Sequence, residues 1–325
     1  MAEKNVEAGD GGPDRGREAG SPGQIPRPGW RDILIRTWQE QTEHNLSIIA
    51  GGVAFYALMA IFPTLAAMVS IYGLVANPAD VQAHLSSLSG MLPESGYQII
   101  DDQLTQIVSA SGGALGLGLI AAILFALWSA SRGMLAVIMA LNVVYEEPEK
   151  RSFLKLNAIA LLLTLLGIIF FLISLSLIAA LPGLLSHFGL PDSFRILITI
   201  GRWPLLAVLI ALALAFLYRY APSREEPQFR WISWGAVLAT IVWIIVSALF
   251  SIYVSNFGSY NETYGSISAI IILMMWLYIT AYVVLMGGEL NAEMEHQTKK
   301  DTTTGEPEPM GGRGAHVADK LGKKP

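Results

Sequence analysis

Residues 158–180 read AIALLLTLLGIIFFLISLSLIAA, an apolar run longer than the roughly 20 residues that a helix needs to cross a bilayer. The run lacks the alternation of apolar and polar residues that a barrel strand shows, and backbone groups in lipid must be hydrogen-bonded within their own segment. It therefore predicts a transmembrane helix. Five other stretches share this character, and the six together cover roughly 46–76, 113–145, 153–180, 195–219, 231–256 and 264–290.

The sequence thus predicts an all-α polytopic membrane protein with six transmembrane helices. Hydrophobic residues make up 53% of the chain and charged residues only 14%, where about 25% charged is usual for a soluble domain. The first 30 residues have no apolar centre, so we expect no cleavable signal peptide and insertion through the first span itself.

The basic residues lie between alternate pairs of spans. Segments 77–112 and 257–263 contain no Lys or Arg, and the loop after the third span offers only Arg195 at its end. Because cytoplasmic loops carry an excess of Lys and Arg, both the N and C termini are predicted to be cytoplasmic. The residues on the predicted cytoplasmic side are Lys4, Arg15, Arg17, Arg27, Arg31, Arg36, Lys150, Arg151, Lys155, Arg219, Arg224, Arg230, Lys299, Lys300, Arg313, Lys320, Lys323 and Lys324.

Composition divides the chain into three parts. Residues 1–28 and 298–325 contain too few apolar residues to form a core and are predicted to be disordered tails on either side of a membrane domain at 29–297. Within that domain, apolar residues recur at helical spacing over 29–44, which predicts an amphipathic helix at the cytoplasmic interface. Residues 77–112 predict two short amphipathic helices on the outer face, which either cover an entrance or seal the bundle.

Several classes of chemistry lack the residues that they need. The chain has no Cys, its five His are scattered without metal-ligand spacing, and it has no P-loop, nucleophile elbow or dinucleotide fingerprint. The net charge of −5 is set mainly by tails and loops and gives no reason to expect a nucleic-acid partner. We therefore expect no enzymatic activity, no catalytic residues, no metal site and no cofactor.

Arg132 is the least usual residue for a membrane span. It stands in LWSASRG (127–133), where a lipid-facing Arg costs about 2.5–3.5 kcal/mol, so it should face protein or a wet cavity. Asn142, ten residues on, lies within about 80° of the same helical face. Two interpretations stay open: Arg132 ties helices together through backbone carbonyls, or it serves a pathway or an anion site for a carboxylate or a lipid phosphate.

The first and fourth spans also carry candidates. Arg202, in GRWP (201–204), either reaches the outer interface with its charged group or forms a positive outer mouth. Pro63 cannot donate a backbone hydrogen bond, which frees the carbonyl of Met59 and predicts a kink. That carbonyl could bind a cation, a water or a side chain, whereas the nearby Gly51 and Gly52 are typical of close helix packing.

The sixth span ends in acidic residues. Glu289 and Glu293 stand in GGELNAE (287–293), and Tyr278, Tyr282 and Glu289 fall on one helical stripe because steps of four and seven return near the same face. An acid at the inner end of a tyrosine stripe predicts a proton-binding or cation-binding mouth. The alternative is an interfacial carboxylate paired with a cytoplasmic Arg or Lys.

Ten short motifs occur in order along the chain: AFYAL (54–58), FP (62–63), LWSAS (127–131), ALNVVY (140–145), RWPL (202–205), LYRYAP (217–222), WGA (234–236), YGSI (264–267), WLY (276–278) and GELNA (288–292). With these motifs the chain resembles the YihY/BrkB family of bacterial inner-membrane proteins, once labelled ribonuclease BN, over about residues 30–295. The resemblance implies a six-helix, multi-pass protein of the bacterial plasma (inner) membrane, and links to serum resistance, envelope processes and cation/proton exchange. It supplies no catalytic residues, and no constellation here supports the ribonuclease label.

Two functions follow as hypotheses. The first is a secondary transporter or permease for an ion or small solute, motivated by Arg132, Arg202, Glu289 and the Pro63 kink. The second is a non-transporting envelope protein that binds lipid, including anionic lipid, or partner proteins. The lipid bilayer is the partner in both, and a homo-oligomer stays open because small residues pack helices within and between subunits alike.

Overall fold

The computed structural model describes residues 14–75, 113–180, 192–256 and 266–325. The external segment predicted at 77–112 lies outside these described residues. Within them the secondary structure is helical, and six helices are long and apolar enough to cross a membrane, which confirms the predicted all-α fold. They are α2 (Leu46–Val75), α5 (Gly113–Val144), α6 (Phe153–Leu175) with its π-helical extension η2 (Ser176–Ala180), α8 (Asp192–Tyr220), α9 (Phe229–Asn256) and α11 (Ser266–Glu295).

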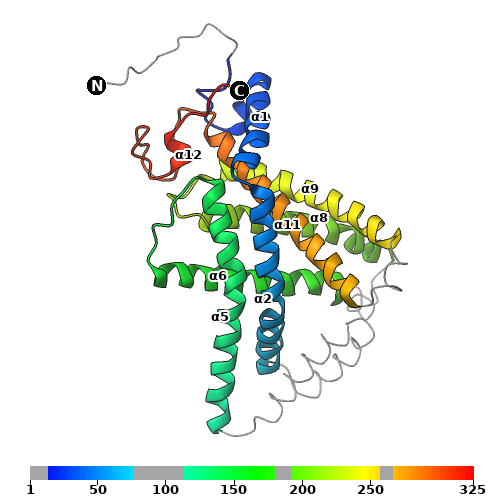
Figure 1. Cartoon of the computed structure of the whole chain (residues 1–325). Helices are drawn as coiled ribbons and strands as arrows, with labels where there is room; N and C mark the ends of the chain where they lie inside the picture. The colour runs from blue at the N-terminus through cyan, green and yellow to red at the C-terminus, as the bar shows by residue number, and fades with distance from the viewer. Residues whose placement is uncertain (1–13, 76–112, 181–191, 257–265) are drawn as a thin grey trace.

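Three shorter helices accompany the spans: the 3-10 turn η1 (Pro22–Gln24), α1 (Arg27–Glu43) and α12 (His316–Asp319). All three lie at one end of the bundle, where the first described residues meet the C-terminal segment (Figure 1). There Arg17 donates a hydrogen bond to the carbonyl of Gly322 at 2.8 Å. We call this the terminal end. That it faces the cytoplasm stays a prediction from the charge distribution.

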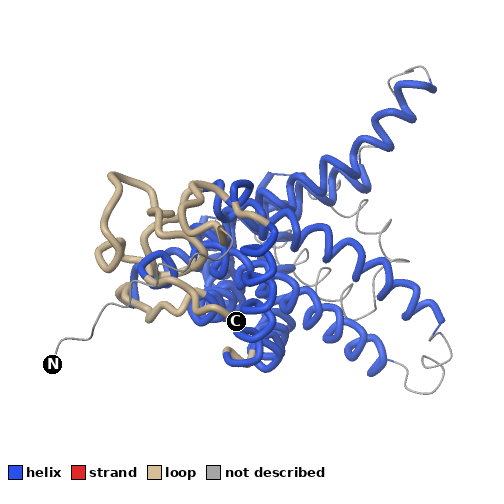
Figure 2. The backbone as a smooth tube through the Cα atoms, turned by 90° about the horizontal axis from the view of Figure 1, so that it is seen from above, coloured by secondary structure: helices blue, strands red, loops and turns tan. Residues whose placement is uncertain are grey.

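The spans come together at the terminal end and spread apart away from it (Figure 1, Figure 2). The main core has the same position, because its buried residues come from the start of α2, α6 and α9 and from the end of α5, α8 and α11. Elsewhere the spans bury little: only 11% of the most apolar window of α8 or α9 is buried. Apolar side chains that are exposed over such lengths require lipid or other protein around them.

Helix α11 lies at the centre of this core, packed against α9, α2 and α5. Its closest approach to α9 is at Gly235 and Gly287, where a Cβ on either residue would collide with the other helix. The backbone N–H of Gly235 donates to Oδ1 of Asn291 at 2.9 Å, so an amide side chain of α11 also ties the helices together. Small residues here allow the two backbones to meet.

Helix α1 differs in one respect from the amphipathic helix predicted at 29–44. An amphipathic interfacial helix keeps its charged residues on a solvated face, but Asp32 and Arg36 are both buried, together with Ile33 and Thr37. The reason is that α1 packs on the end of α11, which supplies a buried carboxylate as a partner for Arg36.

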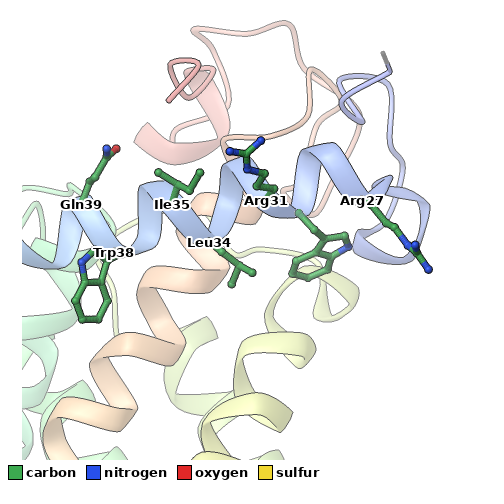
Figure 3. Close-up of a pocket in the computed structure, with 7 residues that line it drawn as sticks. Arg27, Arg31, Leu34, Ile35, Trp38 and Gln39 are labelled. Carbon is green, nitrogen blue, oxygen red and sulfur yellow. The ribbon is translucent and has the colours of Figure 1, made fainter. Parts of the chain in front are cut away.

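The other side of α1 carries a shallow groove of about 670 Å³ (Figure 3). Leu34 and Trp38, which are 55% and 68% exposed, point to the side toward which the spans descend. Arg31 and Gln39 point the opposite way. Apolar groups on the membrane side and polar groups above them are what a helix at a membrane interface requires.

The segment 298–325, predicted to be a disordered tail, packs against the terminal end. Arg313 is 5% exposed and donates to the carbonyls of Ala318 at 2.6 Å and Lys299 at 2.7 Å, while Val317 joins the main core. The composition of the segment is poor in apolar residues, as the prediction assumed. One buried guanidinium with several backbone acceptors orders the segment instead.

A substitution at the α9–α11 contact tests the packing. We expect Gly235→Ala to destabilise the protein by about 1–3 kcal/mol, because the added methyl group meets α11. Gly51→Ala is the matched control: it faces open space, so the change should be neutral or stabilising by about 0.5–1 kcal/mol. Melting temperatures in detergent measure both, and equal values for the two variants would contradict the close approach.

Candidate functional site

Three carboxylates are buried at the terminal end of α11: Glu289, Glu293 and Glu295, here called the carboxylate cluster. Their exposed fractions are 1%, 2% and 0%. The apolar run ends near residue 290, but α11 continues to Glu295 and carries all three acids into the packed core. A buried carboxylate is costly unless it is paired and hydrogen-bonded. Each member of the cluster has such a partner, and each partner comes from a different place in the chain.

Glu293 pairs with Arg36 of α1. Arg36 Nε donates to Glu293 Oε2, and its Nη2 donates to the carbonyl of Glu293 at 3.1 Å and to Oε1 of Gln297 at 2.9 Å. The ring of His296 lies 3.2 Å from the other carboxylate oxygen. This pair joins two residues 257 positions apart.

Glu295 pairs with Arg224 of the α8–α9 connection. Two parallel hydrogen bonds, of 3.0 and 2.7 Å, join the guanidinium to the two carboxylate oxygens, and both side chains are fully buried. Thr302 donates to the same carboxylate at 2.6 Å, and the guanidinium lies 5.1 Å from the centre of the Tyr145 ring. A bidentate pair of this kind is strong and directional.

Glu289 has a partner of another kind. Nδ1 of His44, the residue that caps the C-terminus of α1, lies 3.1 Å from Glu289 Oε2. Nε2 of the same ring lies 3.9 Å from Glu40. The hydrogen bond to Glu289 raises the pKa of His44 above its usual value of 6.5, although burial of the ring opposes this shift. This pair can therefore change its charge near neutral pH.

The tyrosine stripe predicted on α11 faces the same part of α1. Tyr282 donates to Oε1 of Gln41 at 2.8 Å, and the rings of Tyr278 and Tyr282 stack with their centres 6.2 Å apart. Tyr282 and Glu289 therefore both contact the last turn of α1. Their proposed roles stay predictions.

Asn142 is in a different environment. Its Oδ1 accepts from the backbone N–H of Ser223 at 2.8 Å, and its Nδ2 donates to Glu149 at 2.9 Å. Hydrogen bonds from Arg151 lower the pKa of the Glu149 carboxyl to about 2, so this carboxylate stays charged at neutral pH. Asn142 thus joins the end of α5 to two connecting segments.

Arg132 lines a groove of about 560 Å³ between α2, α5 and α6. Its Nη2 donates to Oδ1 of Asn157 in α6 at 3.0 Å, and its guanidinium lies 4.3 Å from the centre of the Trp128 ring. Its Nε is buried and has no hydrogen-bond partner among the described residues. Asn142, Tyr282 and Glu289 do not line this groove.

The two remaining candidates lie apart from the cluster. Arg202 donates to the carbonyl of Ile178 in η2 at 3.0 Å, and its guanidinium lies 5.3 Å from the Trp203 ring. Pro63 lies within α2, which continues to Val75. The structure therefore brings together Glu289, Tyr282 and Tyr278, and it separates them from Arg132, Asn142, Arg202 and Pro63.

Sequence reasoning offered pairing with a cytoplasmic Arg or Lys as an alternative, but it did not identify Arg36, Arg224 or His44 as the partners of the cluster. One signal for them was available: the chain is poor in charged residues, yet three acids occur within seven positions at 289–295. Several acids on one helix end imply several cations nearby. Which cations these are depends on tertiary contacts between distant segments.

Comparison with known proteins gives a consistent result. The family model described as "Virulence factor BrkB" matches residues 37–311. The ribonuclease-like protein YfkH of Bacillus subtilis is 35% identical over 273 residues, covering 82% of this chain and 96% of the relative. UPF0761 membrane proteins of Psychromonas ingrahamii and Idiomarina loihiensis are each 27% identical to this chain, and the matched regions cover 89% and 88% of those two relatives. No solved structure matches the chain.

Arg224 provides a test of the cluster. We expect Arg224→Met to destabilise the protein by about 3–5 kcal/mol, because it leaves the carboxylate of Glu295 buried without its cation. Arg230→Met changes an exposed residue at the start of α9 and should stay within about 0.5 kcal/mol of the wild type. Melting temperature in detergent distinguishes the two, and similar values would contradict the importance of the buried pair.

The His44–Glu289 pair predicts how stability depends on pH. Because folding raises the pKa of His44, its contribution is complete below about pH 6.5 and is lost as the pH rises through the raised value. The melting temperature of the wild type should therefore fall more steeply above pH 6.5 than that of His44→Gln. Glu43→Gln, an exposed neighbour on α1, should keep the wild-type profile. An unchanged profile in His44→Gln would contradict the prediction.

Proposed function

We propose, for a chain that belongs to the BrkB family of membrane proteins, that it acts as a secondary permease in which proton binding at His44 and Glu289 is linked to the passage of an ion or small solute. The observation that carries this function is the unequal pairing of three buried acids. Glu293 and Glu295 face arginines, which keep their charge at all physiological pH values. Glu289 faces a histidine, whose charge changes near pH 7.

A route for protons supports the function. Glu40, His44 and Glu289 form a series whose side chains are 28%, 15% and 1% exposed, so it leads from the surface to a buried acid. An imidazole can accept a proton at one nitrogen and release one from the other. Nδ1 of His44 lies within hydrogen-bond distance of Glu289, at 3.1 Å, whereas Nε2 lies 3.9 Å from Glu40, so a proton passes between His44 and Glu40 through a water or after a small movement of the side chains.

The pair is also placed to link its charge to the packing of the spans. It joins α1 to α11, and α11 contacts α2, α5 and α9. Breaking a buried charge pair costs several kcal/mol, the size of change that moves a two-state equilibrium from one side to the other. The Tyr282–Gln41 hydrogen bond is a second contact between α1 and α11, and a movement of α1 relative to α11 would strain it as well.

The groove beside Arg132 is the proposed binding site for the solute. It is mostly apolar, and Arg132 supplies a guanidinium of which one N–H group has no partner among the described residues. A carboxylate or a phosphate group fits the fork of an Arg, so an anionic solute is favoured at this position. A cation would meet like charge there.

Reconstituted proteoliposomes with an internal pH dye test the function. We expect an imposed solute gradient to drive proton movement for at least one member of a panel of small carboxylates, phosphate, chloride and alkali or alkaline-earth cations. His44→Gln and Glu289→Gln should reduce this coupling about tenfold or more, which corresponds to 1.4 kcal/mol. Glu43→Gln, one residue from His44 and exposed, should keep it.

Two outcomes would overturn parts of the proposal. Solute flux that is unchanged in Arg132→Ala would rule out the groove as the binding site for the solute. The absence of flux for every member of the panel would remove transport itself, and would favour a non-transporting envelope protein that binds lipid or partner proteins.

A further inference from the structure

Another groove, of about 700 Å³, opens at the terminal end between α6 and α8. It spans the boundary between polar and apolar surface. Its rim is formed by residues at and before the start of α6 and at and after the end of α8, and its floor by residues deeper within both spans. Helix α6 packs mainly on α5 and only slightly on α8, which leaves this space between the two helices.

The rim of the groove is basic: five Lys and Arg side chains line it, against two Glu side chains. Arg151, Arg219 and Arg224 are held by carboxylates. Lys150 pairs with Glu147 at 2.8 Å, but it is 53% exposed, so water screens the pair. Lys155, which is exposed, has no ion pair to any residue in the part of the chain that the structure describes. Lys150 and Lys155 therefore present two exposed ammonium groups at the rim, of which Lys155 has no carboxylate partner; Glu225 is the rim carboxylate without an ion pair among the described residues.

The floor of the groove is apolar and runs along the membrane-spanning part of α6 and α8. Leu162 is 57% exposed, Leu166 48% and Phe216 46%, although all three line the groove. These residues belong to spans, so in the membrane they face acyl chains and not water. A ligand that fits both parts needs a negative head and an apolar tail.

We propose that this groove binds one anionic phospholipid, with its phosphate at Lys155 and Lys150 and an acyl chain along Leu162, Leu166 and Phe216. Basic pockets between transmembrane helices bind anionic headgroups in this way. A soluble phosphate compound has no apolar chain that could contact the floor of the groove. A zwitterionic lipid would bring a cationic group close to Lys155, which has no carboxylate partner among the described residues.

Native mass spectrometry of the full chain in detergent tests the site. With phosphatidylglycerol and phosphatidylcholine of the same acyl chains, we expect the protein to retain phosphatidylglycerol preferentially. Lys155→Gln should lower its affinity for phosphatidylglycerol about fivefold, as expected for one basic residue near an anionic headgroup. Arg230→Gln is the matched control, because Arg230 is an exposed cation in the first turn of α9 but lies outside the groove, and it should bind like the wild type.

The floor is tested with Leu162→Trp, which fills the groove with a larger apolar side chain and leaves the rim charges unchanged. We expect weaker binding of phosphatidylglycerol, with an unchanged melting temperature because Leu162 is exposed. Equal retention of the two lipids, or wild-type affinity in Lys155→Gln, would overturn the site. Wild-type binding in Leu162→Trp, or displacement of the lipid by millimolar inorganic phosphate, would overturn its assignment to a lipid. Solute flux enters none of these measurements, so the site and the proposed permease function can fail separately.

Discussion

Three carboxylates buried at the end of one helix constrain the rest of the molecule. Because Glu289, Glu293 and Glu295 lie inside the packed terminal end, α1 and the α8–α9 connection must bring His44, Arg36 and Arg224 to them. Removal of any partner leaves a buried charge, whose cost exceeds that of most single contacts in a protein. The terminal end is therefore held by directional pairs, whereas α8 and α9 bury only 11% of their most apolar windows and leave the rest for lipid to cover.

The six spans could be predicted from length and apolarity, since a helix in lipid satisfies its own backbone and needs no knowledge of its neighbours. The end of α11 and the order of the C-terminal segment could not. An apolar run marks the hydrocarbon region, but Glu293 and Glu295 extend the helix beyond it into a polar core. Arg313 orders its segment through backbone carbonyls, which every sequence contains and which no composition reveals.

Helical periodicity predicted which residues of the candidate site share one face of a helix, but not which residues of other helices they contact. The stripe of Tyr278, Tyr282 and Glu289 follows from helical spacing; Tyr282 and Glu289 meet the end of α1, and Tyr278 stacks on Tyr282. The same reasoning linked Arg132 with Asn142, yet ten residues separate them by about 15 Å along a helix. At that distance each finds its own partners, Asn157 for one and Ser223 with Glu149 for the other. Asn157 belongs to the third predicted span, one residue before the apolar run at 158–180.

The position of the carboxylate cluster on the last span also decides when the protein becomes complete during its synthesis. Arg36 and Arg224 leave the ribosome before the acids that neutralise them, Arg36 by 257 residues. Until α11 is made, the guanidinium groups of Arg36 and Arg224 have no carboxylate partner and stay in water, so the core cannot close around them. A nascent chain that stops before residue 289 therefore lacks the charge pairs that join α1 and the α8–α9 connection to the bundle.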